Sequence, residues 1–282
     1  MLRGGHNKDK EESQSDSGAA ALEGKTTDSE AARETSSRDI GMKPPFFTGW
    51  ERTIATTQKE GPSEKKGSEP RKNRRELDTP RGIITIENYF PADELEKLEI
   101  EDGIKMFSRH QPARQKQALL NVARSENGNV ISAVKDGTLV AYIGIHYPSE
   151  KERWGKPDYK WLFEFGAIEV SDNYREVGLA DGMLSIAFDD PSYEDKIMFT
   201  TGFTWHWDLE GTGLRKMEYH DLGVRLFGKY GFMEMATDEP NISMDPANLF
   251  MARIGRDASF SRYQKFATLL FANEWEAMLR GS

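Results

Sequence analysis

The sequence contains no cysteine, which excludes disulfide bonds and thiolate metal sites and fits a reducing compartment. No apolar run approaches the roughly 20 residues that a membrane-spanning helix needs. Residues 1–10 also lack the apolar stretch that a signal peptide requires. We therefore expect a cytoplasmic protein with no membrane partner.

A net basic charge is missing as well. Residues 1–75 hold 15 Lys or Arg and 13 Asp or Glu, and residues 76–282 hold 23 and 34. The balance is thus +2 in the first segment and −11 in the second. Nucleic acids bind to surfaces that offer net positive charge to their phosphates, so we expect no nucleic-acid partner.

The first segment is also poor in apolar residues. Residues 1–75 are rich in Ser, Thr, Gly, Glu and Lys and show neither a helical nor a strand period. Their one apolar cluster, residues 44–50, is either a docking motif or a chance feature of a linker. Such a segment cannot offset the entropy of ordering itself. The sequence therefore predicts a disordered extension over residues 1–75 and a folded domain over residues 76–282.

From residue 82 onwards, apolar periodicity predicts alternating strands and helices. Asp136-Gly137 between two apolar runs predicts a hairpin with a type I′ turn, in which both central residues have positive φ. This order of elements is typical of an α/β or α+β layer around one core. The expected strands are 82–89, 129–134, 139–146, 160–170, 197–201, 231–236 and 248–254. One helix is expected to begin at residue 91. Four others are expected at residues 111–124, 178–188, 217–229 and 260–279.

A loop of small residues precedes the helix expected at 178–188. Its free backbone N–H groups and the helix dipole form an anion cradle that suits a pyrophosphate. Gly178 allows a close approach to the backbone, and Arg175 adds a forked donor. The alternative is an ordinary strand-to-helix turn. The candidate phosphate-binding residues are Arg175, Glu176, Val177, Gly178, Leu179 and Ala180.

This loop resembles the Arg/Gln-x-x-Gly-x-Gly/Ala signature of the GNAT superfamily of N-acetyltransferases. Residues 165–170 resemble the fourth strand of that superfamily, and residues 226–232 resemble its late helix-to-strand junction. The resemblance implies a central mixed, mostly antiparallel sheet flanked by helices. It also implies acetyl-CoA as the co-substrate and no metal. The backbone of Ile168 and Val170 would hold the pantetheine and thioester.

A narrower resemblance is to the acetoin utilization acetyltransferase family. It implies acetyl-CoA-dependent acetylation of a protein lysine, with acetyl-CoA synthetase as the partner that is inactivated. Two alternatives stay open: a small-molecule amine N-acetyltransferase, and a non-catalytic acetyl-CoA-binding regulatory partner. The stretches that carry this resemblance are Glu152-Arg153-Trp154, Gly166–Val170, Trp205–Leu209, Ala236–Pro240, Pro246-Ala247-Asn248 and Met251–Gly255.

The strand at 160–170 offers two glutamates as the general base that acetyl transfer to an amine needs. Glu164 and Glu169 differ by an odd number, so they face opposite sides of a regular strand. Glu164 lies six residues before Val170, where the histone-acetyltransferase branch of the superfamily places its glutamate base. We therefore expect Glu164 to be catalytic, and a salt-bridged strand glutamate is the alternative.

Three further features have more than one interpretation. Many superfamily members have a tyrosine as the thiolate acid where this sequence has Phe227, which leaves Tyr219, Tyr230 or water for that proton. His206 and Asp208 favour a loop role over a metal site, because no other histidine lies near them. The pair at residues 238–239 is either a lysine-binding group or a solvated turn.

Overall fold

The structure is a computed structural model that describes residues 67–104 and 112–273, all within one compact unit. The extension expected over residues 1–75 thus lies mostly outside the described residues. The strands are β1 (Arg74–Thr79), β2 (Gly82–Glu87), β3 (Glu99–Ile100), β4 (Asn129–Lys135), β5 (Thr138–His146), β6 (Leu162–Val170), β7 (Ile197–Gly202), β8 (Met233–Glu234) and β9 (Leu249–Ile254). The helices are α2 (Ala92–Leu95), α3 (Pro112–Arg124), α4 (Leu179–Phe188), α5 (Leu209–Thr212), α6 (Lys216–Gly228), α7 (Pro240–Ser243) and α8 (Phe260–Leu270).

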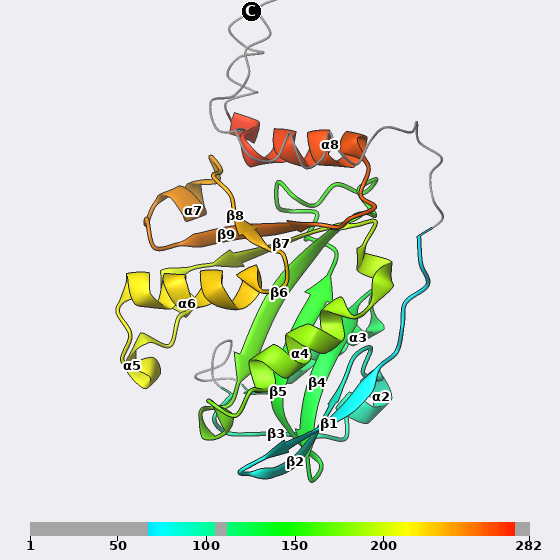
Figure 1. The fold of residues 1–282 in the computed structure, drawn as a ribbon, viewed down its shortest axis with the longest axis vertical. Coiled ribbons are helices and arrows are strands. Elements are labelled where there is room, and N and C mark those ends of the chain that lie inside the picture. Colours follow the sequence, from blue (N-terminus) through cyan, green and yellow to red (C-terminus); the bar gives the residue numbers. More distant parts are fainter. Residues whose placement is uncertain (1–66, 105–111, 274–282) are drawn as a thin grey trace, which may run out of the picture. The chain divides into compact units, whose positions relative to one another are not determined.

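The nine strands form one mixed, mostly antiparallel sheet in the order β1-β2-β4-β5-β6-β7-β9-β8, with β3 beside β5 (Figure 1). Among the described strands, only the β6–β7 and β3–β5 pairs are parallel. The β4–β5 hairpin has Asp136 and Gly137 at φ 49° and 80°, which confirms the predicted turn. The expected fold class, a mixed sheet flanked by helices, is confirmed.

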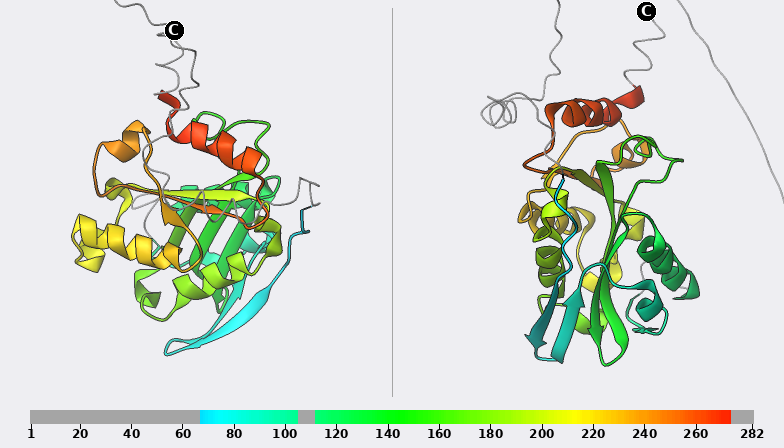
Figure 2. Two further views of the ribbon diagram at one scale, coloured as in Figure 1. Left: turned by 45° about the horizontal axis from the view of Figure 1, so that its top comes forward. Right: turned by 90° about the vertical axis from the view of Figure 1, so that its right-hand side faces the viewer.

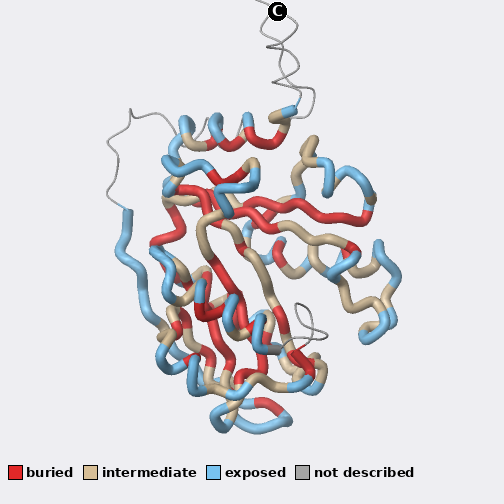
Figure 3. Tube along the Cα trace, turned by 180° about the vertical axis from the view of Figure 1, so that it is seen from behind, coloured by how far each residue is buried: buried red, intermediate tan, exposed pale blue. Residues whose placement is uncertain are grey.

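Helices α3 and α4 cover opposite faces of the sheet (Figure 2). The core under α4 contains Ile143 and Phe165, and the core under α3 contains Leu119 and Tyr142. Because both faces are covered, the central strands are buried along most of their length (Figure 3). Within the described residues, no helix combines the length and apolarity needed to cross a bilayer.

A third core lies under α8, where Phe266 packs against β7 and β9. Helix α8 ends at Leu270 with Phe271 as its C-cap, and Ala272 and Asn273 are again helical. The rest of the helix that the sequence predicts to residue 279 lies outside the described residues. Thr237 Oγ1 and Asp238 N donate to the Leu270 carbonyl at 2.6 and 2.9 Å. The Arg153 guanidinium reaches the same carbonyl and pairs with the Asp238 carboxylate. These donors satisfy the carbonyl at the end of the last turn.

The strand expected at residues 231–236 is shorter, because only Met233 and Glu234 pair with β9. Asp238, one of two acids considered for lysine binding, is occupied by Arg153. The other, Glu239, accepts hydrogen bonds from the Asn241 and Ile242 amides at the start of α7. Both therefore have structural partners.

The segment before residue 76 contributes to this fold. Strand β1 begins at Arg74 and pairs with β2, so the boundary predicted at residue 76 cuts through it. The Arg71 amide donates to the buried Asp190 carboxylate at 3.2 Å. The Arg75 guanidinium pairs with Asp189 and donates to Ser185 Oγ at 3.1 Å on α4. Residues 71–75 therefore strap the sheet edge to α4.

We predict that a chain starting at residue 67 keeps the melting temperature of the full chain, whereas one starting at residue 76 does not. The shorter chain loses at least six hydrogen bonds made by residues 71–75, each worth about 1 kcal/mol. For a domain of this size, the melting temperature should fall by roughly 10–20 °C. Thermal melts followed by circular dichroism check this. Equal melting temperatures for the two truncations would show that the strap does not contribute.

Candidate active site

Strands β6 and β7 diverge in the middle of the sheet. They pair only between residues 162–164 and 197–199. Beyond Glu164, β6 continues beside β5, whereas β7 continues beside β9 (Figure 1). The second half of β6 therefore has an edge that no described strand covers.

Two residues on this open edge direct their backbone N–H and C=O groups away from β5. Ser171 N donates to Val140 O at 3.0 Å, just beyond the end of β6. Hydrogen-bonded and non-hydrogen-bonded pairs alternate along antiparallel strands. Ile168 and Val170 therefore belong to non-hydrogen-bonded pairs, and their N–H and C=O groups are directed towards the gap. These are the two residues whose backbone the resemblance assigns to the pantetheine and thioester.

A β-bulge places both strand glutamates on one face of β6. The register with β5 shifts at Gly166, which is an extra residue in β6. Glu164 lies opposite His146 and Glu169 opposite Tyr142, and these partners are four residues apart on β5. The prediction that the two glutamates face opposite sides is therefore wrong, because the bulge changes the alternation of side chains.

Glu164 lies at the last paired position, where β6 and β7 begin to separate. Its side chain is partly buried, and burial raises the pKa of its carboxyl to about 7. Its two charged neighbours act on this pKa in opposite directions, since His146 lowers it and Glu152 raises it. A carboxyl with this pKa can accept a proton at neutral pH.

Glu169 has a different environment. Its side chain is 5% exposed and accepts hydrogen bonds from Gln115 Nε2 at 2.6 Å and from the Tyr142 hydroxyl at 2.8 Å. Gln115 also donates to the Tyr142 hydroxyl at 3.0 Å, so the three side chains form a closed, buried network. This network fixes α3 against β5 and β6 and suits a structural carboxylate better than a base.

The loop at residues 175–180 has the geometry of an anion cradle. Glu176 and Gly178 have φ of 64° and 84°, and Gly178 is the residue before the first turn of α4. No side chain caps that helix, and no described atom lies within 4 Å of a β-carbon placed on Gly178. Alternating left-handed residues direct successive N–H groups to one side, which suits a phosphate. Val177, Leu179 and Ala180 complete this loop and the first turn.

Arg175 contributes to the loop by holding it in place. Its guanidinium pairs with Asp172 at 2.6 Å and with Asp208 at 2.7 Å. Asp208 also accepts from the Gly211 amide at 3.0 Å at the start of α5. Asp208 is therefore a structural partner of the loop, and no metal-binding cluster occurs within residues 67–104 and 112–273.

The position of the usual tyrosine acid is apolar. Phe227 is buried edge-on against Phe165, with ring centroids 5.1 Å apart. The Tyr230 hydroxyl donates to the Asp181 carbonyl on α4 at 2.8 Å. Tyr219 stacks on Trp207 at 4.9 Å, and the charges of Arg175, Asp208 and Glu169 act on its hydroxyl. Of the two tyrosines, Tyr219 is the one on whose hydroxyl the charge of Glu169 of β6 acts.

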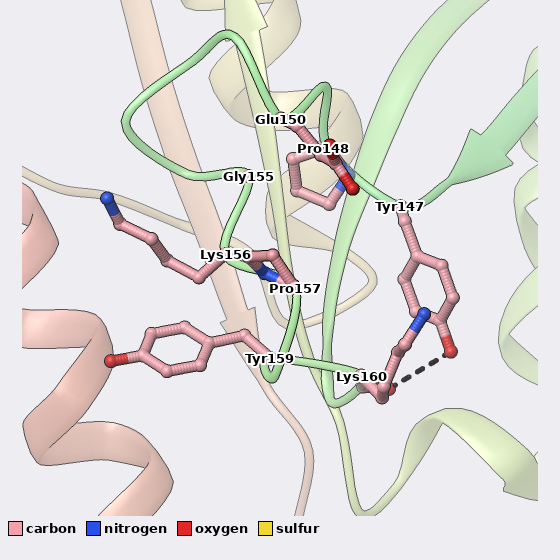
Figure 4. A pocket seen from close by; sticks show the side chains of 8 residues that line it. All are labelled: Tyr147, Pro148, Glu150, Gly155, Lys156, Pro157, Tyr159 and Lys160. Atoms are coloured by element: carbon pink, nitrogen blue, oxygen red, sulfur yellow. Dashed lines mark hydrogen bonds between the residues drawn. The ribbon is translucent and has the colours of Figure 1, made fainter.

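A separate surface pocket lies in the connection between β5 and β6 (Figure 4). Tyr147, Tyr159 and Lys160 help to line it, and the Lys160 ammonium lies 4.7 Å from the centre of the Tyr147 ring. This pocket adjoins His146 through Tyr147, and residues 175–180 do not line it.

Comparison with known proteins agrees with this geometry. No protein-family model matches the chain. The acetoin utilization protein AcuA of Bacillus licheniformis is 35% identical over 201 residues, which cover 71% of this chain and 95% of that protein. The AcuA protein of Bacillus subtilis is 33% identical over 199 residues, which cover 71% and 94%.

A solved structure extends the likeness to three dimensions. The acetoin utilization protein from Exiguobacterium sibiricum is 30% identical and superposes with a TM-score of 0.71. The match covers 74% of this chain and 99% of that one. The open edge of β6 and the cradle at residues 175–180 lie within the part of the chain that carries the GNAT resemblance. The chain thus belongs to the family of the acetoin utilization protein AcuA.

Proposed function

We propose that this chain transfers the acetyl group of acetyl-CoA to a lysine of a protein in the cytoplasm. We further propose that the acceptor is acetyl-CoA synthetase, which the modification inactivates. The family resemblance supports this choice of acceptor. The observation that supports this chemistry is the position of Glu164, which lies where β6 separates from β7. Burial there raises the pKa of its carboxyl to about 7.

Acetyl-CoA fits the open edge of β6. The pyrophosphate would accept hydrogen bonds from the amides of residues 176–180, and the dipole of α4 adds partial positive charge there. The unpaired backbone of Ile168 and Val170 would hold the pantetheine arm, so that the thioester lies towards Glu164. The backbone thus binds most of the co-substrate, whereas side chains serve the reaction.

The reaction requires a free amine. Lysine is an ammonium ion at neutral pH, because its reference pKa is about 10.4. Glu164 accepts one proton from the ammonium, directly or through one water. The amine nitrogen then bonds to the thioester carbonyl carbon, the carbon–sulfur bond breaks, and the coenzyme A thiolate leaves. Tyr219 or water supplies the proton that the thiolate finally takes.

The first test of this proposal uses isotope-labelled acetyl-CoA, purified acetyl-CoA synthetase and mass spectrometry. We expect labelled lysine on the synthetase and a parallel loss of its activity. Label on added small amines alone would instead show a small-molecule acetyltransferase. A stable complex without label would show a non-catalytic regulatory partner.

The cofactor assignment predicts a contrast between two variants of one size. Asp and Asn both tolerate the left-handed conformation of Gly178, and they differ only in charge. Gly178→Asp places a carboxylate against the pyrophosphate, so acetyl-CoA affinity should fall about 10- to 100-fold more than in Gly178→Asn. Isothermal titration calorimetry measures both. Equal acetyl-CoA affinities of the two variants would show that the pyrophosphate binds elsewhere.

The assignment of the base predicts that Glu164→Gln lowers turnover about 10²–10⁴-fold near neutral pH. Acetyl-CoA affinity should hardly change, because the substitution preserves shape. The loss should shrink at high pH, where more of the lysine is already deprotonated. Glu152→Gln is the matched control, since it makes the same chemical change at an exposed neighbour and should keep turnover within a few-fold. The assignment would be refuted if Glu152→Gln lost turnover and Glu164→Gln kept it.

A further inference from the structure

A group of aromatic rings lies at the surface just beyond the end of β7. Trp205 is 53% exposed, and its ring stacks on that of Phe203 with centroids 4.7 Å apart and planes inclined by 8°. The ring of His206 meets these two rings edge-on, at 5.9 Å from Trp205 and 6.0 Å from Phe203. We call Phe203, Trp205 and His206 the aromatic platform.

The platform belongs to a stretch of backbone that is fixed on both sides. The Thr204 amide donates to Asn248 Oδ1 at 2.8 Å, and Thr204 is buried. On the other side of Trp205, the Trp207 ring stacks on Tyr219 with centroids 4.9 Å apart. A ring that is already held in place loses little conformational freedom when it binds a partner. The exposed face of Trp205 is therefore a preorganised surface.

Residues 203–208 border the gap between β6 and β7. The stretch starts directly after Gly202, the last residue of β7. It ends at Asp208, which pairs at 2.7 Å with Arg175 in the loop that follows β6. The platform thus lies on a segment that connects the two sides of the candidate active site.

The distance from the platform to the proposed base follows from the strand register. Phe199 of β7 is the partner of Glu164 of β6. Phe203 lies four residues further along the chain, which corresponds to about 13 Å of extended backbone. An extended segment of another protein would therefore span from Glu164 to the platform with about four residues.

The electrostatic surroundings of the platform favour a positively charged partner. Residues 76–282 hold 23 Lys or Arg and 34 Asp or Glu, a balance of −11. Lys216 pairs at 2.6 Å with Asp245, which also accepts a hydrogen bond from Thr204 beside the platform. Desolvation lowers the pKa of His206, so its ring is neutral at pH 7 and does not repel a cation. Among aromatic side chains, tryptophan has the ring face that attracts cations most strongly.

We propose that the aromatic platform binds an arginine or lysine side chain of the acceptor protein, about four residues away from the lysine that is acetylated. The proposal rests on the proposed function, in which that lysine reaches Glu164. The cation lies over the Trp205 ring, and the net negative charge of the domain attracts the basic segment that carries it. No bond forms or breaks at the platform, so the platform selects the acceptor and leaves the chemistry to the gap.

The test compares short peptides that contain one lysine and, about four residues away, either arginine or citrulline. Citrulline has nearly the shape of arginine but no charge. With the full chain and acetyl-CoA, the arginine peptide should have a KM about 3- to 30-fold lower than the citrulline peptide, at similar kcat. Moving the arginine next to the lysine should remove most of this advantage. Equal KM values for the arginine and citrulline peptides would overturn the proposal.

Three variants separate the Trp205 ring from the general negative charge of the domain. Trp205→Leu keeps an apolar side chain but removes the ring, so most of the preference for arginine should disappear. Trp205→Phe should keep part of it, because a phenyl ring attracts cations less strongly. Phe260→Leu is the matched control at another exposed ring, at the start of α8, and should leave the preference unchanged. A full preference in Trp205→Leu would refute the role of this ring.

A binding measurement without acetyl transfer separates this inference from the proposed function. In ¹⁵N-labelled full chain, the Trp205 indole N–H resonance is identified by its absence in Trp205→Leu. The arginine peptide should shift this resonance much more than the citrulline peptide does. Such a shift without acetylation of any protein supports the platform and refutes the proposed function. Labelled lysine on acetyl-CoA synthetase, with an indole resonance that neither peptide moves, refutes the platform alone.

A second copy of this chain is the alternative occupant, because exposed tryptophans also anchor protein–protein interfaces. Light scattering of the full chain and of its Trp205→Leu variant distinguishes the two occupants. A basic acceptor segment as the occupant requires the same molar mass for both proteins. A lower molar mass for Trp205→Leu would show that the platform joins two copies, and it would overturn the proposal.

Discussion

The separation of β6 from β7 is the constraint on which the candidate site depends. The two strands pair with different neighbours: β6 stays beside β5, whereas β7 stays beside β9, where Phe199 and Phe250 pack with Phe266 of α8. The core under α4 spans both sides of the gap, because it contains Phe165 of β6 as well as Met198 of β7. Extending the β6–β7 pairing would disturb this packing, so burial elsewhere stabilises an open strand edge. The exposed backbone at Ile168 and Val170 is thus a consequence of packing on both sides.

The residues that carry the family resemblance divide into two physical roles. Arg153 and Asp238 belong to two separate motifs, and they pair with each other beside the end of α8. Asp208, in a third motif, pairs with Arg175 and so supports the loop at residues 175–180. These motifs identify the family through its scaffold, whereas Glu164, the proposed base, lies on β6. Recognition of the family therefore does not by itself locate the acceptor site.

The strongest sequence predictions concerned elements whose pattern is local. The turn at Asp136-Gly137 follows from the two residues that adopt it, and the start of α4 follows from the position of Gly178. Strand β1 was missed because it is a polar edge strand from which only Leu77 packs on the core. The faces of the two glutamates were wrong because the bulge at Gly166 is visible only once β5 is aligned with β6. The partner of Glu164, His146, could be found only from that same register.

The loss of the usual tyrosine at Phe227 is easier to accommodate than the loss of a base would be. A thiol has a reference pKa of about 8.5, so a thiolate near neutral pH is a tolerable leaving group even when no acid lies beside it. A lysine ammonium, with a reference pKa of about 10.4, is almost never free at that pH. Deprotonation of the amine is therefore the step that most needs help. In the proposed function, the partly buried carboxyl of Glu164 meets that need, whereas Phe227 packs against Phe165.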